Sequence, residues 1–152
     1  YIRFAILQIN MLKNRFRNIL VALDGSLNSR RGMNEAISLA RQTDGSITGI
    51  YVLPSLPSEP EISVSYRQYL SRVSEEFMSH AITAAARHGI EFERKIVVSN
   101  DIVNAITTFA KSDKFDVIVI GARGRSSPNS AFLGSVSHGI LYSCRKPILV
   151  VR

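Results

Sequence analysis

Five short runs of apolar residues alternate with longer amphipathic stretches along the chain. The runs cover residues 18–23, 46–53, 91–98, 115–120 and 147–152. Three of them are continuously apolar, which is typical of strands that are covered on both faces in a parallel sheet. The run at 91–98 alternates and contains four charged residues, so we expect it at an edge of the sheet.

The stretches between these runs repeat apolar residues at intervals of three or four positions. This spacing predicts helices over residues 29–43, 65–88, 101–112 and 134–145. Asn100 is the expected N-cap of the third helix, and Gly89 is expected to end the second. The resulting order, β-α-β-α-β-α-β-α-β, predicts one α/β domain with right-handed crossovers.

The most irregular connection is LPSLPSEPEISVS, residues 53–65. Its three prolines argue against a helix and favour an extended, exposed segment. Two interpretations remain open for this segment: a lid over a site, or a variable surface loop.

The positive charge of the chain is concentrated at its beginning. Of 19 basic residues, four lie in residues 1–17, which contain none of the 12 acidic residues, so a net charge of +7 falls to +3 for the remainder. No predicted helix carries a long basic stripe with interleaved aromatic residues. The pattern therefore argues against a nucleic-acid partner.

The cysteine content and the length of the apolar runs favour a cytoplasmic protein. Cys144 is the single cysteine, so no disulfide can form within the chain, and its apolar helical surroundings predict a buried structural thiol. No run approaches the ~20 apolar residues that span a bilayer, so we expect no membrane partner. Residues 1–15 are interpreted as an N-terminal extension, partly tag or upstream sequence, and 16–152 as the domain.

Two unusual loops follow the first and fourth predicted strands. They are Asp24-Gly25-Ser26 and Gly121-Ala122-Arg123-Gly124-Arg125. In doubly wound sheets, ligands bind beyond the carboxyl ends of the strands, where the strand order reverses. If the first strand is central, these two loops therefore face the same crevice.

The residue types in the second loop suit a phosphate group. Glycine lets backbone N–H groups approach an anion closely, and Arg123 and Arg125 add positive charge. Gly134-Ser135 stands where the fourth helix begins, and a helix start presents unpaired N–H groups to an anion. Any one of these glycines would more simply be a turn residue, but the set at a switch point favours phosphate.

The spacing Gly121-x2-Gly124-x9-Gly134-Ser135 resembles the G-x2-G-x9-G-[S/T] motif of the ATP-binding branch of the universal stress protein family. The resemblance extends to RNILVALDGSLNS (17–29), GIYVL (49–53), FDVIVIGARGR (115–125) and LGSVSHGILYSCRKPILVVR (133–152). It implies a five-stranded parallel sheet of order 3-2-1-4-5 with helices on both faces. The x9 segment contains Pro128, which could change how Arg125 addresses the γ-phosphate.

The resemblance also implies a site for ATP, or for ADP or AMP, with Mg or Mn on the phosphates and no metal held by protein side chains alone. Ala22, Leu23 and Asp24 would border the adenine and ribose, with Val52 contacting the adenine edge through its backbone. Ile120 and Gly121 would flank the ribose. The residues around the triphosphate would be Arg123, Gly124, Arg125, Gly134, Ser135 and Val136, with Ser137 as a further hydroxyl contact. The family commonly forms homodimers through its last strand, here residues 147–152.

The preferred function is therefore a nucleotide-dependent regulatory switch in a stress response. A slow ATPase or nucleotide-transferring enzyme is the first alternative, and a dimerisation module without nucleotide is the second. Asp24 is the only acid near the predicted site, so no catalytic residue is assigned and weak ATP hydrolysis is the most we expect. The chain has no nucleophile elbow and no P-loop, and the spacing of His80 and His88 does not suit a zinc site.

Overall fold

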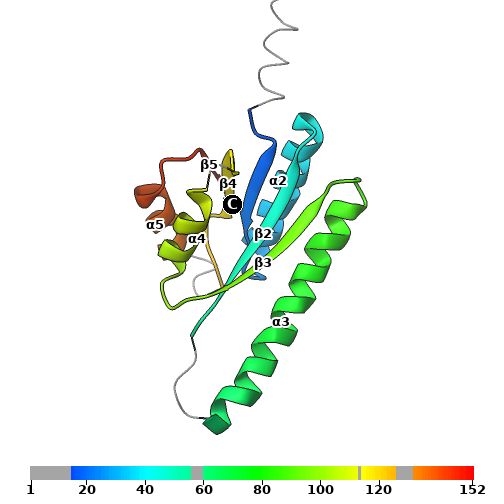
Figure 1. The fold of residues 1–152 in the computed structure, drawn as a ribbon. Helices are drawn as coiled ribbons and strands as arrows, with labels where there is room; N and C mark the ends of the chain where they lie inside the picture. The colour runs from blue at the N-terminus through cyan, green and yellow to red at the C-terminus, as the bar shows by residue number, and fades with distance from the viewer. Residues whose placement is uncertain (1–14, 56–59, 113, 126–131) are drawn as a thin grey trace, which may run out of the picture.

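A computed structural model describes residues 15–55, 60–112, 114–125 and 132–152, with the backbone alone for 60–63. Five strands and four helices alternate along these residues (Figure 1). The elements are β1 (Asn18–Ala22), α2 (Leu27–Thr43), β2 (Ser46–Leu53), α3 (Pro60–Ala86), β3 (Phe92–Val98), α4 (Ile102–Ala110), β4 (Val117–Gly121), α5 (Ser135–Ser143) and β5 (Ile148–Val151).

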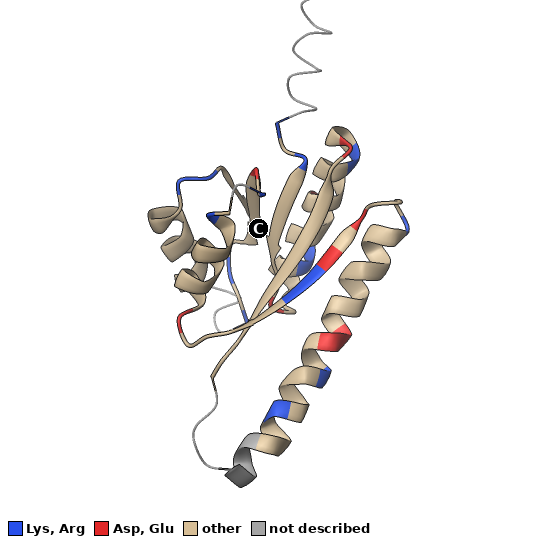
Figure 2. Cartoon of the chain, in the orientation of Figure 1, with Lys and Arg blue, Asp and Glu red and all other residues tan. Residues whose placement is uncertain are grey.

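The strands form one parallel sheet in the order β3-β2-β1-β4-β5. In the central strand β1, Leu20 pairs with Thr48 of β2 on one side and with Ile118 of β4 on the other. The predicted fold class and strand order are therefore confirmed. The edge position expected for residues 91–98 is also confirmed, and β3 carries the charged side chains of both signs that this position tolerates (Figure 2).

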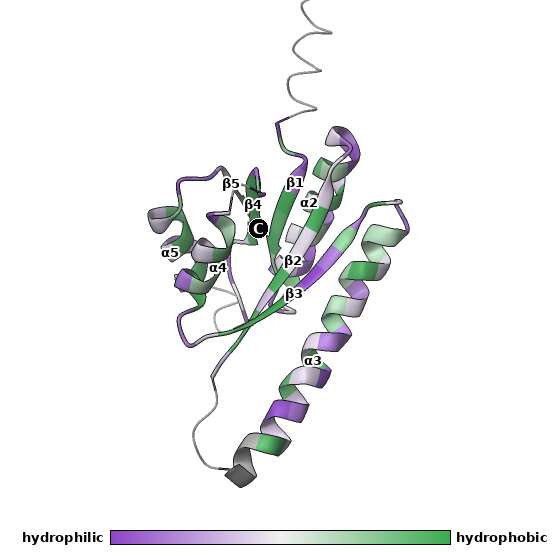
Figure 3. Ribbon diagram, viewed as in Figure 1, coloured by the Kyte–Doolittle hydropathy of each residue, from purple (hydrophilic) through white to green (hydrophobic). Residues whose placement is uncertain are grey.

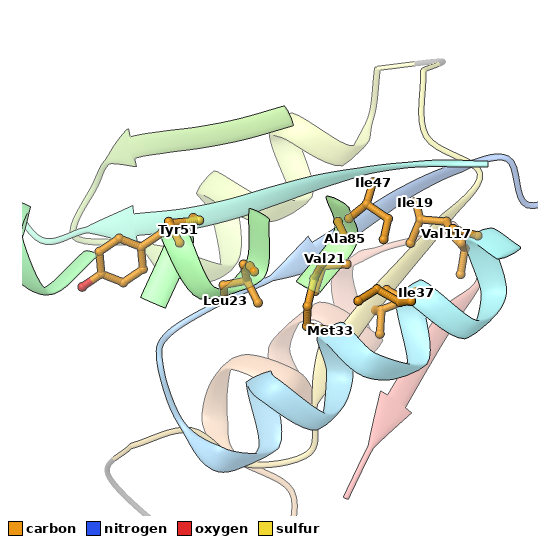
Figure 4. Close-up of a cluster of buried hydrophobic side chains, with 14 residues drawn as sticks. Ile19, Val21, Leu23, Met33, Ile37, Ile47, Tyr51, Ala85 and Val117 are labelled. Carbon is orange, nitrogen blue, oxygen red and sulfur yellow. The ribbon is translucent and has the colours of Figure 1, made fainter. Parts of the chain in front are cut away.

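Consecutive side chains of the central strands enter two separate cores because they alternate between the faces of the sheet. Ile19 and Val21 pack beneath α2 and α3, in the cluster shown in Figure 4. Leu20 and Ala22 pack on the opposite face, against residues of α4 and α5. All four side chains are buried, which explains why the sequence of β1 is continuously apolar and why β1 is green in Figure 3.

Three local predictions are corrected by the structure. Helix α3 begins at Pro60, so the segment predicted to be extended over 53–65 is helical from residue 60 onward. Proline suits the first turn of a helix because the N–H group that it lacks would be unpaired there. The N-cap of α4 is Asp101 rather than Asn100. Cys144 is partly exposed at the end of α5 rather than buried.

Candidate functional site

The loop after β1 is held by short hydrogen bonds that also start α2. The Asp24 carboxylate accepts a hydrogen bond from the backbone N–H of Ser26 at 2.9 Å. The Ser26 hydroxyl oxygen in turn accepts one from the N–H of Ser29 at 3.1 Å, which makes Ser26 the N-cap of α2. Between them, Gly25 has a φ of +78°, a left-handed conformation that glycine adopts without strain. Asp24 is thereby fixed at the carboxyl end of the central strand.

The start of α2 lies directly against the end of β4. A Cβ atom added to Gly121 would lie 2.8 Å from the backbone carbonyl carbon of Asn28, so only glycine fits there. The Asn28 side chain donates a hydrogen bond to the carbonyl oxygen of Arg123 at 3.3 Å. Asn28 therefore ties the two loops together, a role that its sequence context did not reveal.

The segment that leads into α5 is fixed by bonds to the carbonyl oxygen of Ala122. The N–H of Gly134 and the hydroxyl of Ser137 both donate to this oxygen, each at 2.8 Å. The Ser137 hydroxyl also lies 3.0 Å from the carbonyl oxygen of Gly134. These two donors therefore shape the loop, and the ligand contact expected of the Ser137 hydroxyl stays a prediction.

Helix α5 begins at Ser135, and its N-cap Gly134 supplies no side-chain hydrogen bond. The first N–H groups of a helix have no partner inside it, so the amides of Ser135, Val136 and Ser137 remain for an anion. Residues 126–131, including Pro128, lie outside the described residues.

A cavity of about 510 Å3 opens where these loops meet, at the carboxyl ends of the central strands. We call it the sheet-end cavity. Besides Ser137, its lining includes the twelve other residues that the family resemblance implies: Ala22, Leu23, Asp24, Val52, Ile120, Gly121, Arg123, Gly124, Arg125, Gly134, Ser135 and Val136. Their roles toward a nucleotide stay predictions.

Eleven further residues line the same cavity, and most come from the ends of β2 and β3 and from α4. They are Ser26, Ser29, Ile50, Tyr51, Pro54, Ser99, Asn100, Ile102, Ile106, Leu133 and Ser137. Six of them lie in segments that resemble the family, and Ser137 is one of the expected contacts. No motif marks the other five, Pro54, Ser99, Asn100, Ile102 and Ile106, because the strand order rather than their spacing brings them to the cavity. Ile50, Ile106 and Ile120 are buried and give the cavity an apolar floor.

The charged side chains in the lining favour an anion. Arg123 and Arg125 face a single acidic residue, Asp24. Tyr51 lies nearby: burial raises the pKa of its phenol, Asp24 raises it further, and Arg125 opposes that change. The phenol of Tyr51 therefore stays neutral at physiological pH and can act as a hydrogen-bond donor.

Two general features of the described residues limit other kinds of site. Their histidine, cysteine and acidic side chains form no cluster of three that could hold a metal ion. None of their helices is both long enough and apolar enough to cross a bilayer.

Comparison with known proteins places this geometry in context. A sequence profile of the Universal stress protein family matches residues 15–152. The universal stress protein YxiE of Bacillus subtilis is 28% identical over 153 residues, with 90% of this chain and 99% of YxiE covered.

Solved structures share the fold. The protein described as hypothetical protein MJ0577 is similar with a TM-score of 0.80 and 20% identity, covering 90% of this chain and 96% of its own. A universal stress protein from Archaeoglobus fulgidus in complex with dAMP has a TM-score of 0.68 and 22% identity, covering 91% and 99%.

Proposed function

Since this chain belongs to the Universal stress protein family, we propose that it is a regulatory protein of the ATP-binding branch, in which the sheet-end cavity holds an adenine nucleotide. One observation carries the proposal. The loops that contain Asp24 and Gly124, two arginines and the start of α5 all line one cavity. The volume of about 510 Å3 lies within the range of about 300–1,000 Å3 that is usual for small-molecule sites.

The two ends of the cavity suit the two ends of a nucleotide. Ile50, Ile106 and Ile120 provide apolar surface for a base, and the backbone at Val52 provides polar groups for its edge. At the other end, the guanidinium groups of Arg123 and Arg125 supply charge for phosphates.

The space for phosphates also depends on glycine, which has no side chain, at residue 124. A Cβ atom on residue 124 would lie 2.8 Å from Asp24 Oδ2, so Gly124 keeps open the space beside this carboxylate. The amides of Ser135 and Val136 at the start of α5 add donors with the favourable direction of the helix dipole. The dAMP complex of the Archaeoglobus fulgidus protein supports the choice of an adenine nucleotide.

A divalent cation would accompany the phosphates. We expect Mg²⁺ or Mn²⁺ to be held mainly by phosphate oxygens, because Asp24 is the one acidic side chain in the lining of the sheet-end cavity. The cation would offset phosphate charge, and the protein would contribute the two arginines and the amides.

The regulatory role would follow from nucleotide occupancy. Asp24 and the Arg123 carbonyl are tied to α2 through Ser26 and Asn28, so a bound phosphate group would bias the positions of both loops. We further propose a cytoplasmic homodimer that forms through β5, whose Leu149 is 39% exposed on an edge strand.

Calorimetry with ATP, ADP and AMP tests the proposal directly. We expect binding at millimolar concentration or better by the wild-type protein and a large loss in Gly124→Val. Mass spectrometry of small molecules released from the denatured protein provides an independent measurement, in which a co-purified adenine nucleotide is the expected result. Absence of binding in wild-type protein that is folded by circular dichroism rejects the proposal.

A phosphate-release assay separates the regulatory protein from the slow ATPase. We expect release no faster than in a mock preparation. Release that is lost in Asp24→Ala while the fold survives would favour the enzyme instead.

A further inference from the structure

A second cavity, of about 440 Å3, lies between α2 and α3. We call it the interhelical cavity. Its lining combines Leu23 of the β1 end with Arg30, Met33 and Asn34 of α2 and with α3 residues that repeat at helical spacing. The α3 residues are Val73, Glu76, Phe77, His80, Ala81 and Ala84.

The cavity exists because α3 diverges from the sheet. This helix has 27 residues, and its N-terminal end projects beyond the sheet (Figure 1). Ala81 and Ala85 are buried against the core near its C-terminal end, whereas Val73 and Phe77 are only half-buried. Val73 and Phe77 therefore stay partly accessible from the cavity.

The floor of the interhelical cavity is apolar and its rim is charged. Leu23, Met33 and Ala81 are all less than 7% exposed and form the floor. The charged residues in the lining are Arg30, Arg125, Asp24 and Glu76. Arg125 and Asp24 also line the sheet-end cavity, whereas Arg30 and Glu76 do not. In the described part of the chain, the Arg30 guanidinium has no hydrogen bond or ion pair.

Phe77 provides an aromatic wall and connects the two cavities. Its ring meets the Tyr51 ring edge-on with centroids 4.9 Å apart, and Tyr51 lines the sheet-end cavity. A Cβ atom on Gly25 would lie 3.0 Å from the Phe77 ring, so Phe77 also touches the loop that carries Asp24. Figure 4 shows Tyr51 at one end of the buried cluster, at the far end of β2.

We infer that the interhelical cavity is a second ligand site, which takes a small aromatic acid with its ring against Phe77 and Met33 and its anionic group toward Arg30. The apolar floor provides area for the ring, and offset or edge-on aromatic contacts add to it. The Arg30 guanidinium provides the partner for the anionic group, because charge-assisted hydrogen bonds are the strong ones. Asp24 and Glu76 also line the cavity, and both disfavour a second negative group on the ligand.

The test uses 8-anilinonaphthalene-1-sulfonate, a fluorescent aromatic molecule with one anionic group. The full chain is titrated with the dye while saturating ATP and Mg²⁺ occupy the sheet-end cavity. We expect saturable binding that Arg30→Gln weakens by about tenfold. Arg31→Gln is the matched control, since Arg31 is the adjacent exposed arginine of α2 and is absent from the lining.

Filling the cavity gives a second variant. Ala81→Trp places a large side chain on the floor and should abolish dye binding, whereas Ala86→Trp, at an exposed position of the same helix, should not. If Ala81→Trp fails to fold, the Arg30 and Arg31 pair still decides the question. Equal effects of Arg30→Gln and Arg31→Gln, full displacement of the dye by ATP, or no saturable binding would overturn the inference.

The Arg30→Gln and Arg31→Gln comparison is repeated without nucleotide, so that the test of the second site does not depend on ATP binding and the two proposals can fail separately. One consequence does depend on the proposed function. Because Phe77 touches both Tyr51 and the loop at Gly25, saturating dye should change the ATP affinity of the wild-type protein by about fivefold or more. Equal ATP affinities with and without the dye would contradict this coupling.

Discussion

The carboxylate oxygen Oδ2 of Asp24 lies 2.8 Å from the position that a Cβ atom on residue 124 would occupy. The two loops of the sheet-end cavity therefore approach each other so closely that residue 124 has no room for a side chain unless Asp24 moves. The other oxygen of this carboxylate is committed to the N–H of Ser26. A side chain at residue 124 would therefore affect the loop after β1 as well as the loop that contains residue 124.

Gly124→Ala should weaken ATP binding by about tenfold or more, because the new methyl group displaces the Asp24 carboxylate and narrows the phosphate end. The free energy of unfolding should change by less than about 1 kcal/mol, since the atom in the way is the end of a partly buried side chain, which can shift, and not backbone. Calorimetry and urea denaturation measure the two effects separately. A large loss of stability would contradict this account.

Gly121→Ala should destabilise the fold by about 1–3 kcal/mol, because its Cβ would collide with the backbone of Asn28, which cannot rotate away. Gly32→Ala is the matched control. A Cβ there meets its nearest atom at an ordinary 3.6 Å, inside α2, so the substitution should stabilise the protein by up to about 1 kcal/mol. Urea denaturation of both variants checks the opposite signs.

Asp101→Ala should cost about 1 kcal/mol of stability, because the Asp101 carboxylate accepts a hydrogen bond from the N–H of Asn104 at 2.9 Å and caps α4. Asn100→Ala removes an exposed bond to the N–H of Ser55 and should cost less, about 0.5 kcal/mol. Thermal unfolding compares the two variants. A larger loss of stability in Asn100→Ala than in Asp101→Ala would indicate that Asn100, not Asp101, caps α4.

Tyr51 should make stability decline at alkaline pH. Burial raises the pKa of its phenol above the ordinary value of 10.0, so the neutral phenol contributes stability that is complete below pH 10 and is lost as pH rises through the raised value. Tyr51→Phe should reduce this decline in urea titrations above pH 10. Tyr142→Phe, at a side chain that is 90% exposed, should leave the decline unchanged.

The sheet could be predicted from the sequence because its signals are strong and local. The residues of β1 are apolar without interruption since both faces of this strand are buried, and the alternation with amphipathic stretches then fixes the class of fold. The ends of helices were harder to predict. Asn100 and Asp101 are both good caps, and backbone geometry, which adjacent residues of similar chemistry do not reveal, decides between them.

The candidate site was predictable only where a motif marks it. The glycines and arginines of residues 121–125 belong to a recognisable spacing, whereas Asn28 and Tyr51 do not. Asn28 can bond to the loop after β4 only because β4 lies beside β1 in space. The ring of Tyr51 contacts Phe77, which lies 26 positions later in the chain. Contacts of this kind depend on tertiary structure that periodicity does not encode.

Leu149→Lys should convert the proposed dimer into a monomer, because it places a charge on the apolar edge strand β5, where Leu149 is 39% exposed. Val98→Lys is the matched control on the opposite edge strand β3, where Val98 is 66% exposed, and it should leave the mass unchanged. Sedimentation velocity measures both. A monomeric wild-type protein, or a monomer produced by Val98→Lys alone, would contradict pairing through β5.

The two outer strands of the sheet differ in a way that bears on how far copies of this chain can associate. Glu93, Arg94 and Lys95 put charge of both signs along β3, while β5 contains only aliphatic residues. If two copies pair through β5 as proposed, a two-fold axis would bury both β5 edges and leave the charged residues of both β3 strands facing outward. The assembly would then close at two copies, because further growth into fibres would have to proceed through these charged residues.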